Sequence, residues 1–324
     1  MGKTDFANAV AAVRSVEPHL LDRNDFEKMI SAKTVSEAEA ALAAHGYDLE
    51  SGSAVEAIDD EQQRVWDFLK TYLGGSDTAL CILLYKNDFQ NLKAALKAIM
   101  SDTDPKRLYV YPTLVDSDEL YSSVLERKFE NLPEHMRSAA KEAYSVITES
   151  GDGQLAEMII DRAALEAMAK DALKYGDEFF IEYTRELTVG ANVKTAYRCA
   201  AMGKSVSFIK SALAPCEDLD CDELTEAARK GTQSVLDYLK QTSYRELGEA
   251  FEQSAAAFER LCDDRITQLI QDARYESFGI KPLAAYYLAK EAEIKNLRIL
   301  FTCKRLGIQK EIITERTRKL YDDL

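Results

Sequence analysis

Glycine and proline are scarce in this chain, which has 14 Gly and 6 Pro among 324 residues. Turn-rich β proteins and long flexible linkers use more of both, so neither is expected here. No apolar run is longer than the seven residues from Ala79 to Tyr85, which is far short of the roughly 20 residues that a transmembrane helix needs. The first residues, Met1 to Asp5, lack the apolar segment of a cleavable signal, and we therefore expect a cytoplasmic protein.

Metal-binding residues are also few and scattered. The three histidines (His19, His45 and His135) lie far apart, and of the six cysteines only Cys216 and Cys221 are close in sequence. Neither cysteine has a Cys or His at the spacing of a zinc site, and a reducing compartment keeps such thiols free. We expect no metal site and no cofactor.

Positive charge is in deficit, because 41 Lys and Arg face 56 Asp and Glu, which gives a net charge of −15. Nucleic-acid binding depends on neutralising phosphates with Lys and Arg, so nucleic acid is not an expected partner. No cationic amphipathic segment stands out, and we expect no direct lipid insertion. Any association with a membrane should therefore pass through another protein.

What the chain does contain is helix-forming sequence. Hydrophobic residues make up 46% of it, which is enough for a substantial core. Ala, Leu, Glu and Lys are abundant, and they favour helix over strand. The composition predicts an all-α fold.

A first marker, Asp-x-x-acid, recurs three times between apolar residues. It occurs at Asp22–Asp25, Asp116–Glu119 and Asp220–Glu223, at intervals of 94 and 104 residues. An Asp at the start of a helix accepts hydrogen bonds from unpaired backbone amides, and an acid three residues later can complete a capping box. We favour this interpretation over a magnesium-binding carboxylate cluster, to which Asp263 and Asp264 could also belong.

A second marker, Asn-x-base, recurs at intervals of 101 and 104 residues, as Asn91 with Lys93, Asn192 with Lys194 and Asn296 with Arg298. Each pair is expected inside a long helix. Gly203 and Gly307 follow the second and third asparagine by 11 residues, where a left-handed helix end favours glycine, and Asp102 holds the same position in the first copy. The second copy should be the weakest helix, because Thr188-Val189-Gly190 are poor helix formers.

Two roles are open for the repeated Asn-x-base pairs. In the first, each asparagine makes a structural hydrogen bond between neighbouring helices, repeated because the packing is repeated. In the second, the pairs form a polar ring about a pseudo-threefold axis and contact a partner. We favour the first, and keep all six residues of the three pairs as candidate partner-binding residues.

Several ordered segments resemble one known family. They are Leu20 to Phe26, Ala41 to Tyr47, Asp88 to Lys93 and, above all, Pro282 to Arg298. Together they resemble the C subunit of archaeal and bacterial V/A-type ATP synthases, which is called the d subunit in eukaryotic vacuolar ATPases. The resemblance runs from near residue 6 to near residue 318.

The resemblance implies a funnel-like assembly of three similar helical modules about a pseudo-threefold axis. We place the modules at residues 1–105, 106–209 and 210–324, within one compact body. It also implies a non-catalytic central-stalk subunit on the cytoplasmic face of the membrane. Its partners would be the subunits of the membrane rotor ring and of the central shaft, and it would pass torque between them for ion transport.

Two other functions are kept as alternatives. One is an all-α metal-dependent enzyme that uses aspartate clusters, and the other is a helical scaffold for soluble partners. The chain contains no Gly-x-x-x-x-Gly-Lys-Ser/Thr phosphate loop, so we expect it neither to bind nor to hydrolyse ATP.

Overall fold

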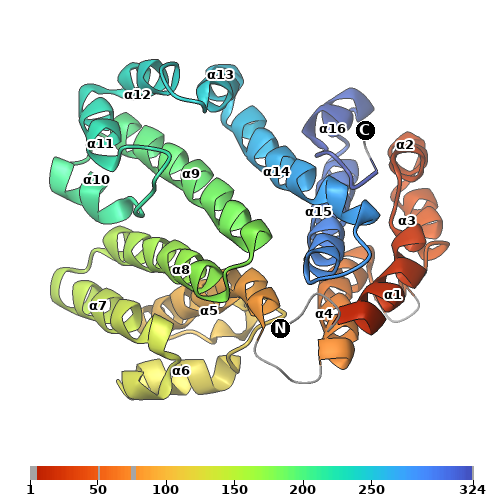
Figure 1. Cartoon of the computed structure of the whole chain (residues 1–324), viewed down its shortest axis with the longest axis horizontal. Helices are drawn as coiled ribbons and strands as arrows, with labels where there is room; N and C mark the ends of the chain where they lie inside the picture. The colour runs from red at the N-terminus through yellow and green to blue at the C-terminus, as the bar shows by residue number, and fades with distance from the viewer. Residues whose placement is uncertain (1–5, 50–51, 74–77, 323–324) are drawn as a thin grey trace. The chain divides into compact units, whose positions relative to one another are not determined.

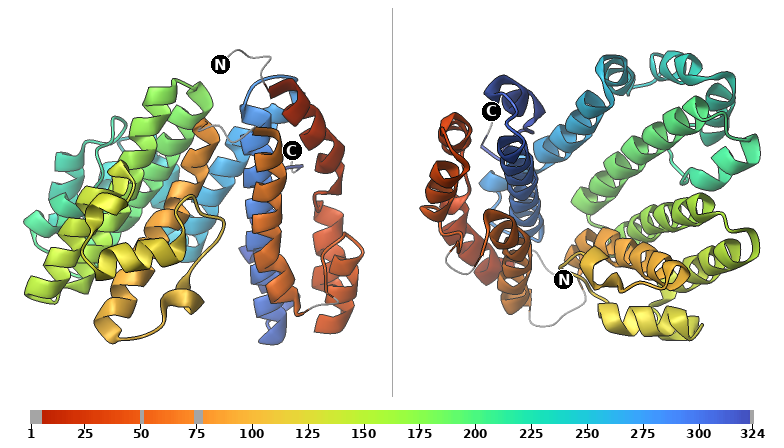
Figure 2. Two further views of the ribbon diagram at one scale, coloured as in Figure 1. Left: turned by 90° about the horizontal axis from the view of Figure 1, so that it is seen from below. Right: turned by 180° about the vertical axis from the view of Figure 1, so that it is seen from behind.

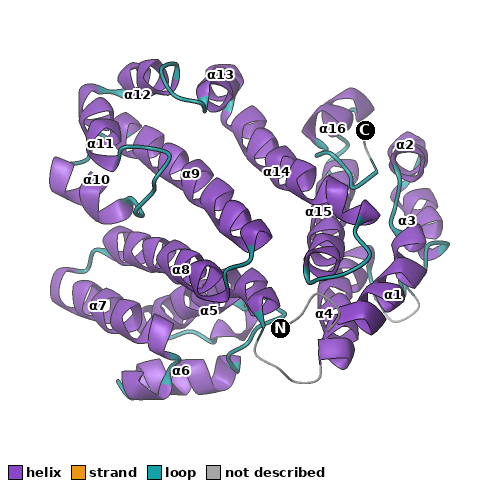
Figure 3. Ribbon diagram, in the orientation of Figure 1, coloured by secondary structure: helices purple, strands orange, loops and turns teal. Residues whose placement is uncertain are grey.

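The computed structural model describes residues 6–49, 52–73 and 78–322. These residues form α-helices, short 3₁₀ turns and loops without any strand (Figure 3), which confirms the all-α prediction. The chain divides into two compact units. Unit 1 combines the two ends of the chain, residues 1–80 and 254–324, and unit 2 is the continuous segment 81–253.

Unit 1 is built around its longest helix, α15. It contains α1 (Ala7–Val16), α2 (Arg23–Ser31), α3 (Val35–Ala43), α4 (Ala54–Leu73), α14 (Ala255–Gln271), α15 (Lys281–Arg305) and α16 (Lys310–Arg316). Helix α15 packs against α4, α14 and α1 (Figure 1). Its apolar stripe is buried as expected, and Leu297 and Phe301 meet Phe26, Leu42 and Ile58 in one core.

Helices α4 and α15 run side by side in opposite directions (Figure 2). Near one end of the pair, the rings of Trp66 and Tyr287 meet edge to face with centroids 5.9 Å apart. Near the other end, Arg298 forms an ion pair with Asp59.

Unit 2 contains nine of the α-helices that the structure describes. They are α5 (Ile82–Ser101), α6 (Ser117–Leu125), α7 (Glu134–Ser150), α8 (Gly153–Tyr175), α9 (Glu178–Ala201), α10 (Val206–Ala212), α11 (Cys221–Lys230), α12 (Thr232–Leu239) and α13 (Arg245–Gln253). Helix α8 lies between α5 and α9, and α7 packs along it (Figure 1). Across the described parts of both units, no helix has the length and apolar character to span a bilayer.

The repeated Asp-x-x-acid marker starts a helix in all three places, as predicted. Asp22, Asp116 and Asp220 are the N-caps of α2, α6 and α11, and each side chain accepts a hydrogen bond from the amide three residues later. At Asp22 the capping box is complete, because the Asp25 carboxylate also accepts from the Asp22 amide. The marker therefore encodes helix starts through purely local bonds.

The three long helices that carry Asn-x-base also end alike. Asp102, Gly203 and Gly307 have φ values of 52°, 63° and 65°, all in the left-handed region. The residue after each donates its amide to a carbonyl five residues earlier, as at Lys204 and Cys199, which is the Schellman pattern. Aspartate is tolerated there because its short polar side chain allows left-handed backbone better than most.

The expectation of a weak second helix was wrong, because α9 runs unbroken through Thr188-Val189-Gly190. Thr188 and Val189 are buried, and the Thr188 hydroxyl donates to the Thr184 carbonyl. Burial against neighbouring helices outweighs the low intrinsic helix propensity of these residues.

The division into three modules stays a prediction. Helices with the Asp cap (α2, α6 and α11) and helices with Asn-x-base (α5, α9 and α15) do alternate along the chain. Along the sequence, however, the boundaries between the compact units fall between α4 and α5 and between α13 and α14, whereas the predicted module boundaries follow residues 105 and 209. The pseudo-threefold funnel likewise stays a prediction.

Candidate functional site

The three repeated asparagines occupy the same structural setting. Asn91, Asn192 and Asn296 are each 1% exposed, on α5, α9 and α15. Each side-chain amide pairs with both backbone groups of one residue in a loop further along the chain, directly after α5 in the first copy but beyond the short helices α10 and α16 in the second and third. Asn91 pairs with Val110 at 3.0 and 2.9 Å, Asn192 with Ala214 at 2.8 and 2.9 Å, and Asn296 with Arg318 at 3.1 and 2.8 Å.

The asparagine side chain bonds both the N–H and the C=O group of one loop residue, as the backbone of a neighbouring strand does in a β-sheet. The asparagine carbonyl accepts from the loop amide, and its NH₂ group donates to the loop carbonyl, so both backbone groups are satisfied without water. The structural role that the sequence favoured is therefore present. Besides the loop backbone, Asn91 and Asn192 also donate to side chains on neighbouring helices, to Ser117 Oγ of α6 at 3.1 Å and to Cys221 Sγ of α11 at 4.0 Å.

The bases of the three pairs lie near the surface. Lys93 on α5 forms an ion pair of 2.6 Å with Asp161 on α8, within unit 2. Arg298 on α15 forms one of 2.7 Å with Asp59 on α4, within unit 1. Lys194 is half-buried on α9. Each base thus lies two residues from an anchored asparagine on a long helix, and partner contact by the six residues stays a prediction.

Two acids that the sequence analysis did not single out share the anchoring. Asp88 and Glu293 lie three residues before Asn91 and Asn296. Oδ1 of Asp88 accepts from the amides of Leu114 and Val115, at 3.0 and 3.2 Å, directly before the Asp116 cap. An acid three residues before the repeated asparagine was the sequence pattern that could have indicated these two residues. The pattern holds in only two of the three copies, because Val189 occupies that position in the second.

Glu293 makes the corresponding contact at the Asp22 cap. Its Oε2 accepts from the amide of Leu21 at 2.7 Å, so α15 near the end of the chain holds the start of α2 near the beginning. The long helix of the third copy therefore supports the cap helix of the first copy, much as α5 supports α6. This contact adds to the packing of α15 against α4 and α1, which joins both ends of the chain in unit 1.

A buried charge cluster surrounds Glu293. Its Oε1 accepts from Lys290 at 2.7 Å and from the Tyr47 hydroxyl at 2.6 Å, and Lys290 also lies 3.1 Å from Glu61. Burial disfavours the charged form of Lys290, but the Glu293 and Glu61 carboxylates outweigh it and raise the pKa of the lysine. Burial and the Glu293 charge raise the pKa of Tyr47 well above its usual value. The cluster thus holds a lysinium and a neutral phenol.

Asp88 has a different environment. Burial raises its pKa to about 7, although the two loop amides work in the opposite direction. Its Oδ2 is buried without a hydrogen-bond partner among the described residues. The pKa of the carboxyl group therefore lies near neutral pH, with Oδ1 bonded to the loop amides and Oδ2 buried.

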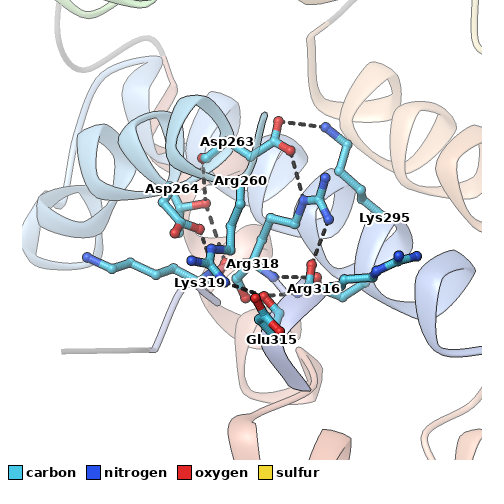
Figure 4. Close-up of polar contacts among 10 residues, drawn as sticks. Arg260, Asp263, Asp264, Lys295, Glu315, Arg316, Arg318 and Lys319 are labelled. Atoms are coloured by element: carbon cyan, nitrogen blue, oxygen red, sulfur yellow. Dashed lines mark hydrogen bonds and ion pairs between the residues drawn. The ribbon is translucent and has the colours of Figure 1, made fainter. Parts of the chain in front are cut away.

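The aspartates of the metal alternative already contact protein cations and amides (Figure 4). Asp263 on α14 lies between Lys295, at 2.7 Å, and Arg318, at 3.0 Å, and Asp264 accepts from the Lys319 amide at 2.7 Å. Arg260 donates to the Glu315 carbonyl beside them. Within the described ranges, no three His, Cys, Asp or Glu side chains gather as metal ligands. This arrangement ties the C-terminal segment to α14 and α15.

Comparison with known proteins covers almost the whole chain. The sequence model of the family described as ATP synthase (C/AC39) subunit matches residues 9–316. The C subunit of the V-type sodium ATPase of Enterococcus hirae is 25% identical over 319 residues, which cover 96% of this chain and 97% of that protein.

Two archaeal relatives match over shorter stretches. The C subunit of the A-type ATP synthase of Methanosarcina acetivorans is 29% identical over 37% of this chain and 34% of its own length. That of Methanothermobacter thermautotrophicus is 26% identical over 51% of this chain and 46% of its own length. The ordered segments, the all-α fold and the end-to-end family match agree, and the chain belongs to the ATP synthase (C/AC39) subunit family.

Proposed function

We propose that this chain is the central-stalk socket of a V/A-type rotary ATPase or ATP synthase. It would join the rotor shaft to the membrane rotor ring, as a peripheral subunit on the cytoplasmic face of the membrane, and it would pass torque between them. The observation that carries the proposal is the end-to-end match to the C subunit of a V-type sodium ATPase, which covers 97% of that relative. In this proposal the chain has no catalytic role, binds no cofactor or nucleic acid and inserts no segment into lipid.

The anchored loops support a mechanical role. A coupling part must not store twist, and free connections between helices would do so. Here the loops after α5, α10 and α16 are each held by an asparagine side chain through two hydrogen bonds, and the first loop is held further by Asp88. Such bonds each contribute about 1 kcal/mol net, and they also restrict the loop to one conformation.

Removal of the chain tests the proposal. Membranes from a strain that lacks it should retain the rotor ring but lose the ATP-hydrolysing sector on washing, and ATP-driven ion uptake should be absent. Adding back the purified chain should restore both. Normal coupled ion transport in the deletion strain would refute the proposal.

Within this function we propose that Lys93, Lys194 and Arg298 help to seat the shaft, with Asn91, Asn192 and Asn296 fixing their helices beside it. The ion pair of Arg298 is exposed, and in the pair of Lys93, whose own side chain is 16% exposed, the carboxylate of Asp161 is exposed. Pairs open to solvent contribute only about 0–1 kcal/mol. Carboxylates on the shaft could therefore replace Asp161 and Asp59 at little cost.

Replacing all three bases by Ala should weaken shaft binding at least about tenfold and change the free energy of unfolding by less than about 2 kcal/mol. The matched control replaces Lys28, Lys128 and Arg245, three exposed bases that also form ion pairs with nearby acids. Binding is measured by a pull-down with purified shaft proteins. Equal affinities of the two triple variants would leave the bases with a purely structural role.

A further inference from the structure

Two of the six cysteines lie on either side of a bend in unit 2. Cys216 belongs to the loop after α10, and Cys221 is the first residue of α11, directly after the N-cap Asp220. Residues 217–219 form the bend between them. Both cysteines are partly exposed. The pair has no place in the mechanical role, and neither cysteine has a third ligand at the spacing of a zinc site.

The folded backbone brings the two sulfur atoms together. The sulfur of Cys221 is in hydrogen-bonding contact with the amide of Cys216 itself. The sulfur of Cys216 makes the same kind of contact with the amide of Leu219, whose carbonyl oxygen lies 3.8 Å from the sulfur of Cys221. Both sulfurs therefore contact the backbone of one short bend. A disulfide requires such an approach, because the Cα atoms of bonded cysteines are only about 4.4–6.8 Å apart.

The first copy shows that the fold does not need a thiol at either position. The register of the asparagine pairings places Pro112 and Ser117 where the second copy has its two cysteines. The Ser117 hydroxyl accepts from Asn91 at 3.1 Å, whereas the Cys221 sulfur lies 4.0 Å from Asn192. Serine makes the shorter bond, so loop anchoring does not explain the presence of two cysteines.

We propose that Cys216 and Cys221 form a reversible redox pair, which peroxide closes to a disulfide and small thiols reopen. In closure, peroxide oxidises one thiol to a sulfenic acid and one water is released. The second thiol attacks that sulfur, the S–S bond forms and a second water leaves. The two thiols lose two electrons, which the peroxide gains. In reopening, two molecules of glutathione reduce the bond and are themselves joined by a disulfide.

Burial sets the conditions for closure. It raises the pKa of both thiols, although the amides of the bend partly oppose it at Cys216. The thiolate is the form that reacts, so the pair closes under sustained oxidation and stays reduced otherwise. This response suits a protein of a reducing compartment, where thiols are ordinarily free.

Closure fastens the loop that Asn192 anchors. In the reduced chain the Cys221 thiol donates to the Ala214 carbonyl at 3.4 Å. A disulfide sulfur has no proton to donate, so this weak bond gives way to a covalent link between the loop and α11. A cross-link removes conformations from the unfolded chain, and it stabilises the folded chain when its geometry is unstrained.

Alkylation after oxidation tests the pair in the purified full-length chain. The protein is treated with hydrogen peroxide and then labelled with iodoacetamide in urea. Cys216 and Cys221 share one tryptic peptide, residues 211–229. This peptide should carry no label and be lighter by two hydrogen atoms than the dithiol form, and prior incubation with glutathione should restore both labels. Cys81 and Cys262, which are also partly exposed, should keep their labels.

Two variants separate the pair from general thiol oxidation. Cys221→Ser introduces the residue that the first copy carries, and its remaining Cys216 should take at least about tenfold more label than in oxidised wild type. The matched control, Cys81→Ser, should close as the wild type does. In urea denaturation, the oxidised wild type should unfold at a higher urea concentration than the reduced protein, and oxidation should not raise the midpoint of Cys221→Ser.

Three results would overturn the proposal. Two labels, or sulfinic acids, on residues 211–229 of the oxidised wild type would mean that the thiols do not join. Disulfide-linked dimers on a non-reducing gel, in place of the closed peptide, would mean that the partner thiol belongs to another chain. An equal or lower urea midpoint of the oxidised protein would mean that the folded loop does not accommodate the bond.

Discussion

Replacing Asn192 by Ala tests whether the repeated asparagine is a structural anchor. The substitution removes two hydrogen bonds. It leaves the amide of Ala214 without a partner and its carbonyl with only the weak bond from Cys221 Sγ at 3.4 Å, although Ala214 is 1% exposed. Two lost bonds and the desolvated backbone groups together should lower the free energy of unfolding by about 2–4 kcal/mol. Lys194→Ala, two residues along α9, should change it by less than about 1 kcal/mol.

Two measurements check this prediction. Urea denaturation followed by far-ultraviolet circular dichroism gives the change in stability, and hydrogen–deuterium exchange reports the loop directly. The amide of Ala214 should exchange much faster in Asn192→Ala, because its acceptor is gone. Asn192→Asp provides a third variant, which keeps an acceptor but faces the Ala214 carbonyl with an oxygen instead of NH₂. A loss below about 0.5 kcal/mol in Asn192→Ala, with unchanged exchange, would refute the anchoring role.

Two further predictions concern α5. Asp102→Gly should raise the free energy of unfolding by about 0.5–1 kcal/mol in urea denaturation, because glycine adopts left-handed backbone without strain, as at Gly203 and Gly307; a loss of stability would contradict this. Burial raises the pKa of Asp88 from 3.8 to about 7, so between these values the folded chain holds more protons than the unfolded chain, and stability should fall as the pH rises. Asp88→Asn should flatten that dependence in urea midpoints compared at about pH 5 and pH 7.5, and an unaltered slope would count against the assignment.

The candidate site was only partly visible in the sequence. The asparagines stood out because they recur at a regular interval on three helices. Their loop partners, Val110, Ala214 and Arg318, share no residue type, because the bonds go to backbone groups. A backbone acceptor leaves no trace in the side-chain sequence, so the pairing needed the tertiary structure.

The charge cluster around Glu293 was invisible for another reason. Its members Tyr47, Glu61 and Lys290 are spread over most of the chain, and none of them repeats in the other copies. Isolated Glu and Lys residues in helical sequence are ordinarily surface residues. Only the packing of α15 against α4 and the N-terminal segment buries them together.

The sequence by itself determined the helix starts at Asp22, Asp116 and Asp220 and the helix ends at Asp102, Gly203 and Gly307. These features depend on hydrogen bonds and backbone angles within one turn, which neighbouring residues set. The tertiary structure decided that α9 continues through Thr188-Val189-Gly190, that Glu293 holds Leu21 from 272 residues away, and that both chain ends share unit 1. Those outcomes depend on burial and on contacts between residues far apart in sequence, which form only when the helices pack. The free energies of these contacts exceed the differences in intrinsic helix propensity between residues.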